Sequence, residues 1–162
     1  MTFLSNIFRN KQQPYEINIR ENYITINNKE ITFPIHLNTL VEIFREPSQH
    51  EYKLLWNVVW DDIGVYCDYG SWDNILSINF LQSKMEKIEF TPSVLFQGKL
   101  LVNNENFSEK DFDTIELKKI AIRRMRYKGK GESFGFSVGL NFNYKEEISK
   151  DRYMIKSNGN SI

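Results

Sequence analysis

Short apolar runs that alternate with polar residues, each ending at a polar turn, constrain the fold of this chain most. Between Tyr15 and Phe33 apolar residues recur at every second position, and the polar segments 20–22 and 27–29 interrupt them. Successive side chains of a strand point to opposite faces, so a period of two predicts half-buried β-strands. Further strands are predicted at 52–60, 63–69, 75–81 and 133–144.

Two segments carry apolar residues at helical spacing. In the first, a helix capped by Asn38 and ended by Pro47 would place on one face Leu37, Leu40, Val41 and Phe44. The second, 112–127, follows a capping box at 108–111 and would share a face among Leu117, Ile120, Ala121 and Met125. We therefore expect an α+β fold, mainly antiparallel sheet with two or three helices.

The two halves of the chain begin alike. Residues 23–30 and 99–106 each place a strand before an Asn-Asn turn, and a predicted helix follows both. A duplicated strand-turn-helix unit is one explanation, and chance recurrence in an Asn-rich chain is the other. The 162 residues fit one domain, which we place at 15–150 with candidate halves 15–90 and 94–150. An N-terminal segment, 1–14, and a flexible tail, 151–162, would flank it.

Composition excludes several classes of protein. Lys plus Arg and Asp plus Glu both number 21, which argues against a general nucleic-acid binder. No apolar run is long enough to span a membrane, and the first residues lack the pattern of a signal peptide. Cys67 is the single cysteine, so no internal disulfide and no multi-cysteine zinc site can form. We expect a cytoplasmic protein without a membrane or nucleic-acid partner.

Motifs of catalytic appearance have simpler explanations. The run from Gly135 to Gly139 matches the G-x-S-x-G pattern of a nucleophile elbow, but no helical pattern follows it and both histidines precede it, so it predicts a strand. His36 and His50 lack the spacing of a metal pair on one helix. We expect no enzyme, no cofactor and no metal. The alternative is a small hydrolase or nuclease that uses either the histidines or the pair Asp61 and Asp62.

The aspartate pair also leaves two structural possibilities. In a turn both carboxylates can reach solvent, or a turn aspartate can bind backbone N–H groups instead. Cys67 lies in an apolar strand, which predicts a buried structural thiol.

The balanced net charge hides two oppositely charged segments. Residues 42–73 contain seven acidic residues against two basic ones, together with three tryptophans, whereas 117–131 contain seven basic residues and no acidic one. The basic segment predicts a solvated helix face, with RNA or protein binding as alternatives. Tryptophan and tyrosine beside aspartate are typical of protein interfaces, so a protein partner ranks above RNA.

Three motifs carry a family resemblance: Ile31-Thr-Phe-Pro34, the short helix with Leu37, Leu40 and Ile43, and Trp60-Asp-Asp-Ile-Gly-Val-Tyr66. With these motifs the region 23–82 resembles small bacterial immunity proteins of polymorphic toxin systems, including contact-dependent growth inhibition. The usual Gly before Pro47 is replaced by Glu46. The resemblance implies a non-enzymatic protein that binds a cognate toxin and blocks its active site or substrate face.

The toxin-binding residues do not follow from the resemblance, because such proteins vary where they contact the toxin. Nuclease toxins have basic substrate clefts, so we expect the acidic, aromatic segment to bind there. The candidate residues are Asp61, Asp62, Asp68, Tyr69, Trp72 and Asp73.

Overall fold

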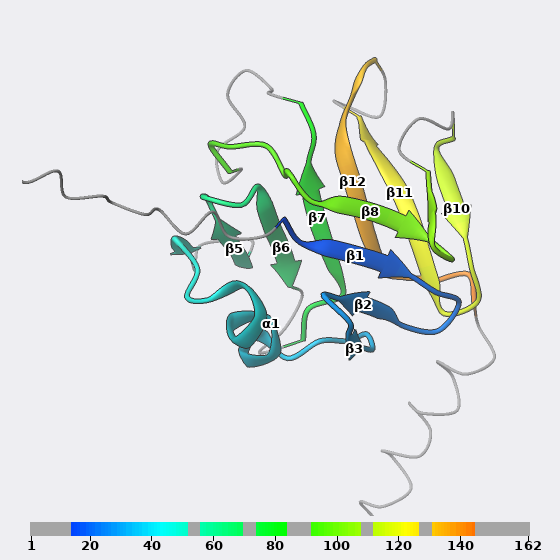
Figure 1. Ribbon diagram of the computed structural model, residues 1–162, viewed down its shortest axis with the longest axis horizontal. Helices are drawn as coiled ribbons and strands as arrows, with labels where there is room; N and C mark the ends of the chain where they lie inside the picture. The colour runs from blue at the N-terminus through cyan, green and yellow to red at the C-terminus, as the bar shows by residue number, and fades with distance from the viewer. Residues whose placement is uncertain are drawn as a thin grey trace, which may run out of the picture.

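The protein consists of two β-sheets and one short helix in a computed structural model (Figure 1). The structure describes residues 14–51, 56–69, 74–83, 92–107, 112–126 and 131–144. Of the predicted segments, the N-terminal segment up to residue 13, the tail at 151–162 and the capping box at 108–111 lie outside these ranges. Within them, no helix has the length and apolar character that crossing a bilayer requires.

The smaller sheet has five strands in the order β3-β2-β1-β8-β9. The only parallel pair between the described strands joins β1 to β8, with Ile17 beside Leu100. This pairing brings the first described residues against the middle of the chain. The strand bounds are β1 Glu16–Ile19, β2 Ile24–Ile26, β3 Lys29–Ile31, β8 Lys99–Val102 and β9 Glu105–Asn106.

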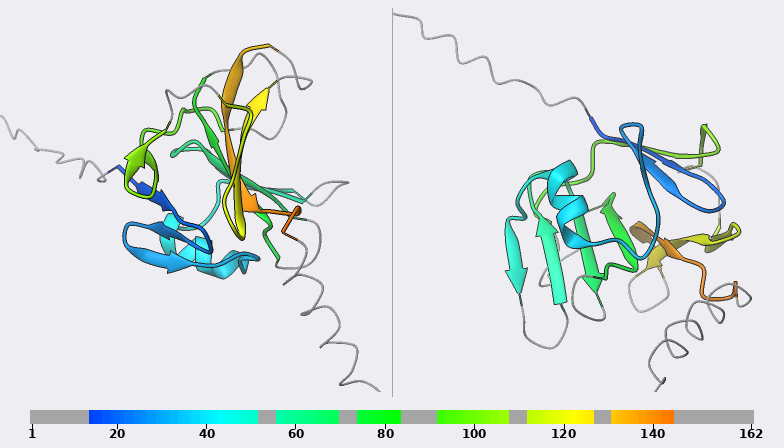
Figure 2. Two further views of the ribbon diagram at one scale, coloured as in Figure 1. Left: turned by 90° about the vertical axis from the view of Figure 1, so that its right-hand side faces the viewer. Right: turned by 90° about the horizontal axis from the view of Figure 1, so that it is seen from below.

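The larger sheet has seven strands in the order β10-β11-β12-β7-β6-β5-β4, and every pair is antiparallel. Its strands run across those of the smaller sheet, which lies over one of its faces (Figures 1 and 2). The strand bounds are β4 Gln49–Glu51, β5 Trp56–Trp60, β6 Val65–Tyr69, β7 Ser77–Leu81, β10 Thr114–Glu116, β11 Ile120–Arg126 and β12 Ser133–Leu140.

Two Asn-Asn turns close hairpins of the smaller sheet. Asn27 and Asn28 have φ of 48° and 66°, and Asn103 and Asn104 have φ of 51° and 70°. Asparagine tolerates this left-handed conformation, and a two-residue turn with two positive φ angles fits the twist of a hairpin. Residues 23–30 and 99–106 therefore share the same local structure, a strand followed by an Asn-Asn turn.

The helix α1, Leu37–Phe44, is confirmed at the predicted residues, although its cap is not the predicted Asn38. Instead, the His36 ring accepts a hydrogen bond at Nδ1 from the Asn38 N–H, at 3.2 Å. The exposed face of α1 carries Glu42, whose carboxylate lies 2.7 Å from Lys29 Nζ on β3. That hydrogen bond and the lysine charge lower the pKa of Glu42.

The predicted α+β fold with two or three helices is wrong, because α1 is the one helix among the described residues. Residues 112–126 form β10 and β11 in place of the predicted helix, so the duplicated strand-turn-helix unit fails at its helix. Every second side chain of β11 lies on the face that carries Val138 and Phe136 of β12; these are Ile120, Ile122 and Arg124. This period of two competes with the helical spacing, and packing against β12 decides the outcome.

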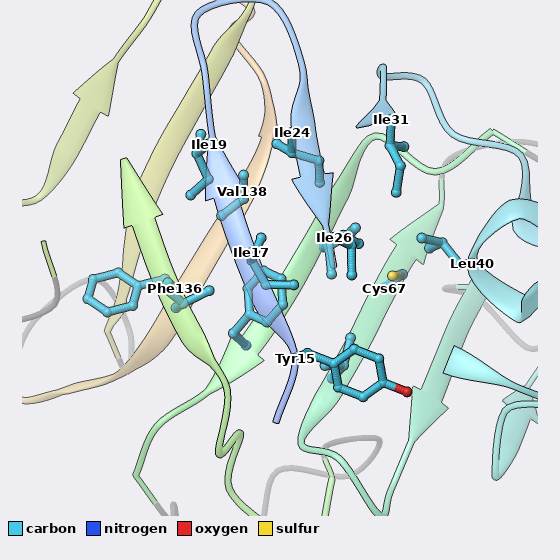
Figure 3. Packing of buried hydrophobic residues seen from close by; sticks show 14 of the residues in the cluster. Tyr15, Ile17, Ile19, Ile24, Ile26, Ile31, Leu40, Cys67, Phe136 and Val138 are labelled. Carbon is cyan, nitrogen blue, oxygen red and sulfur yellow. The ribbon is translucent and has the colours of Figure 1, made fainter. Parts of the chain in front are cut away.

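The core lies between the sheets and is closed at one end by α1 (Figure 3). Ile17 and Ile19 of β1 and Ile24 and Ile26 of β2 face it from the smaller sheet, each at most 1% exposed. From the larger sheet come residues of β5, β6, β7, β11 and β12, among them Val58, Cys67, Ile78, Ile122 and Phe136. Cys67 is fully buried, as predicted.

The predicted strand over the G-x-S-x-G run is confirmed as β12. A Cβ atom at Gly135 would lie 2.2 Å from the Phe80 carbonyl oxygen, and one at Gly139 would lie 2.4 Å from that of Leu76. These glycines let β12 approach β7 closely, so the run has a structural reason independent of any nucleophile.

Because the His36 ring caps α1, we expect His36→Ala to lower the free energy of unfolding by about 1 kcal/mol. His36→Asn supplies another cap acceptor and should keep nearly the whole stability, as measured by urea denaturation. An equal loss in both variants would contradict the capping role.

Candidate functional site

The candidate residues fall into two groups along the β5-β6 hairpin. Asp61 and Asp62 occupy the turn, whereas Asp68 and Tyr69 end β6 at the other end of the hairpin. Five residues of strand span about 13 Å, which separates the two groups. Only the backbone of Asp68 and Tyr69 is described, and Trp72 and Asp73 lie outside the described residues. The turn is therefore the part of the candidate site whose geometry is known.

The Asp61 carboxylate accepts hydrogen bonds from another segment of the same chain. Its Oδ1 accepts a hydrogen bond from the Ser93 N–H at 2.6 Å, and its Oδ2 accepts one from the Ser93 hydroxyl at 2.6 Å. The Asp61 N–H in turn donates to Ser48 Oγ at 3.0 Å. The residue thus connects three segments of chain, which is the structural role that turn aspartates often have.

Trp60, at the end of β5, anchors the turn in the core. It is fully buried, and its Nε1 donates to the Arg45 carbonyl oxygen at 2.7 Å, next to the end of α1. Its ring meets Phe44 at 5.4 Å between centroids, and Phe44 meets Tyr15 at 5.0 Å, both edge to face. Aromatic pairs in this geometry stabilise packing beyond the area they bury.

Gly64 permits the closest approach in the turn. Its φ is +73°, and a Cβ atom there would lie 2.2 Å from the Phe96 nitrogen. The Gly64 carbonyl oxygen accepts from the Leu81 N–H at 3.0 Å, and the Leu81 carbonyl oxygen accepts from the Phe96 N–H at 2.7 Å. Residues 92–98 are held against the hairpin along this path, so the Trp60 to Gly64 motif builds the turn.

A pocket of 510 Å³ opens beside this turn. We call it the turn pocket, and its lining residues are Pro14, Tyr15, Asp62, Ile63, Ser93, Val94, Leu95, Phe96, Gln97 and Gly98. Asp62 is exposed, in contrast to the tethered Asp61 beside it. The hairpin, the segment before β8 and the start of β1 meet here.

Sequence reasoning missed the segment 92–98 as a wall of the site. It has no apolar periodicity, and only the Phe96-Gln97-Gly98-Lys99 part entered the family resemblance. Gly98 is a local signal, since a Cβ atom there would lie 2.2 Å from the Phe96 ring and 2.3 Å from the Tyr15 carbonyl oxygen.

Two residues of the hydrolase alternative, His36 and Asp61, have structural roles, whereas Asp62 is exposed. His36 caps α1, and both Asp61 oxygens accept hydrogen bonds from Ser93. Only the backbone of His50 is described, in β4. In the described ranges, no three His, Cys, Asp or Glu side chains cluster as metal ligands would.

The predicted basic helix is a strand whose arginines contact neighbouring groups. The Arg124 guanidinium lies 4.9 Å from the centroid of the Phe112 ring and 5.0 Å from that of Phe136, and its Nε donates to the Phe112 carbonyl oxygen. Arg126 pairs with Asp113 at 3.0 Å. Arg123 lies 5.7 Å from the centroid of the exposed Phe142 ring. The Arg123 Nη2 also donates to the Leu140 carbonyl oxygen at 3.3 Å. All three arginines thus bind the strand or loop beside them.

We expect Asp61→Ala to lower the free energy of unfolding by about 2 kcal/mol, because it removes two hydrogen bonds to a charged acceptor. The neighbouring Asp62→Ala should stay within about 0.5 kcal/mol of the parent, as for other exposed positions. Chemical denaturation of both variants checks the difference, and similar losses would argue against the tether.

Gly64→Ala should cost about 3 kcal/mol, because it combines a strained φ with a clash against the Phe96 backbone. Gly131 is the matched control: its φ is +81°, but a Cβ atom there would meet no atom of the described residues within 4 Å. Gly131→Ala should therefore cost only about 1 kcal/mol, the strain alone. Thermal and urea unfolding would show whether the two losses differ as expected.

Comparison with known proteins identifies one family. A family model described as Domain of unknown function (DUF7738) matches residues 16–117, which include β1 to β10 and most of the turn pocket. No curated protein and no solved structure matches the chain. The family match neither supports nor contradicts the resemblance to immunity proteins, which stays a prediction.

Proposed function

We propose that this chain, which belongs to the DUF7738 family because the match covers more than half of it, is a cytoplasmic immunity protein. It binds a cognate bacterial toxin, most simply a nuclease, and blocks the active site or substrate face of the toxin. The observation that carries the proposal is the exposed Asp62 at the rim of a pocket, on a turn fixed by its neighbours.

Rigidity of the turn favours binding. Asp61, Trp60 and Gly64 surround Asp62 and are each held by contacts to other segments. A carboxylate on such a turn loses little conformational freedom when a partner binds, which lowers the entropic cost of association. The two adjacent aspartates thus have different roles: Asp61 holds the turn, and Asp62 is exposed to solvent.

Charge supports a basic partner. No arginine or lysine is found among the described residues that line the turn pocket with Asp62. A nuclease toxin carries a basic cleft for its phosphate substrate, so an acidic surface would both speed the encounter and cover the cleft. In β11, by contrast, Arg124 and Arg126 already bind groups of this protein, which weakens the case for RNA binding.

The direct test is co-expression and co-purification with the toxin encoded by the neighbouring gene. We expect a stable complex and protection of cells that express the toxin. Failure to form any complex would contradict the proposal.

Within that complex, Asp62→Lys should slow association roughly fivefold and reduce its salt dependence, because a charge near an interface acts mainly on the on-rate. Glu30→Lys makes the same charge change on an exposed residue of β3 and should leave the rate unchanged. Stopped-flow or surface-plasmon kinetics at two ionic strengths measure the effect. If only Lys118→Glu, on the turn before β11, slows association, the toxin binds at the basic segment and not at Asp62.

A further inference from the structure

We infer that the turn pocket receives one basic side chain of the partner, with its cation at Asp62 and its alkyl stem on the apolar wall. This inference rests on the proposed function and names the chemical class of the group that enters the site. It follows from the shape, charge and hydrogen-bonding capacity of the lining.

The wall of the pocket is largely apolar. Ile63 is partly buried, Val94 is 39% exposed, and Phe96 is 7% exposed at the base. Pro14, Tyr15 and Leu95 complete the apolar lining. A surface of this kind favours the methylene groups of a long side chain, which lysine and arginine bury while the charged end stays in a polar environment.

Among the described residues of the lining, Asp62 alone carries a formal charge. Its neighbour Asp61 is engaged by Ser93, and two carboxylates elsewhere pair with basic groups, Glu42 with Lys29 and Glu16 with Lys99. A carboxylate beside apolar groups binds a cation more strongly than one in open water, because the local dielectric constant is lower.

Hydrogen bonding in the pocket also favours a donor. The Ser93 N–H and hydroxyl both donate to Asp61, and Gln97 Nε2 donates to the Leu95 carbonyl oxygen at 3.3 Å. The Phe96 N–H donates to Leu81. Apart from the second Gln97 Nε2–H, the side-chain groups that Asp62, Ser93 and Gln97 have left are acceptor oxygens: the Asp62 carboxylate, Ser93 Oγ and Gln97 Oε1. Lysine carries three donors and arginine five, and neither carries an acceptor.

The experiment uses the full chain and three small probes: the N-acetyl methylamides of arginine, lysine and citrulline. Citrulline keeps the length and shape of arginine but has no charge. Amide chemical shifts of the ¹⁵N-labelled protein, followed by NMR during titration, should change for Asp62, Ile63, Val94 and Gln97 and should saturate in the millimolar range with a basic probe. Citrulline should bind at least fivefold more weakly.

Two variants localise the effect. Asp62→Asn removes the charge and should weaken binding of the basic probes at least fivefold, whereas Glu30→Gln removes a distant exposed carboxylate and should change nothing. Val94→Ser should weaken binding two- to threefold through the stem. Equal binding of citrulline, shifts outside the pocket, or full binding by Asp62→Asn would overturn the inference.

The arginine and lysine arms show which basic side chain the pocket prefers. A negative result in the probe experiment can also be distinguished from a negative result in the toxin experiment. A protein that binds its toxin but no basic probe overturns this inference and keeps the proposed function. A protein that binds the basic probe through Asp62 but forms no toxin complex keeps the pocket as a site for a basic side chain and overturns the toxin as the source of that side chain.

Discussion

The paired hydrogen bonds between the Asp61 carboxylate and Ser93 are the interaction on which the candidate site depends. They fix the β5-β6 turn to the segment before β8, across 32 positions of sequence. Together with the hydrogen bond from the Phe96 N–H to the Leu81 carbonyl oxygen, they hold the wall formed by residues 92–98 beside Asp62. An aspartate that accepts from both the amide and the hydroxyl of one serine holds that serine in a single orientation, which is why the turn can serve as a rigid platform.

The turn also joins the two sheets. Trp60 reaches from the larger sheet to the end of α1, and Phe44 continues the aromatic contact to Tyr15, which precedes β1 of the smaller sheet. The Lys99 N–H donates to the Tyr15 carbonyl oxygen, so the chain after the pocket is tied to the chain before it. The pocket therefore lies where contacts from both sheets and from α1 meet.

Local patterns predicted several elements without reference to their distant partners. Helix α1, the turn at Asp61 and Asp62, and the strand from Ser133 to Leu140 have signals in their own residues. The helix predicted over 112–127 failed because the segment carries two spacings: Leu117, Ile120, Ala121 and Met125 recur at helical spacing, whereas Ile120, Ile122 and Arg124 occupy every second position, as in a strand. The choice between them is made by Phe136 and Val138 on β12, which no local window contains. The wall at 92–98 was missed for a similar reason, since its order comes from Leu81 and Asp61.

By itself the sequence determined the balanced charge, the Asn-Asn turns, helix α1 and the position of the acidic turn, because each depends on side-chain chemistry and on backbone preferences of adjacent residues. The tertiary structure alone decided which of two neighbouring aspartates is tethered and which is exposed. It also decided that the most basic segment is a strand with arginines packed on phenylalanine rings. Both outcomes depend on partners distant in sequence, and a side chain's hydrogen bonds and burial are fixed only when those partners are in place.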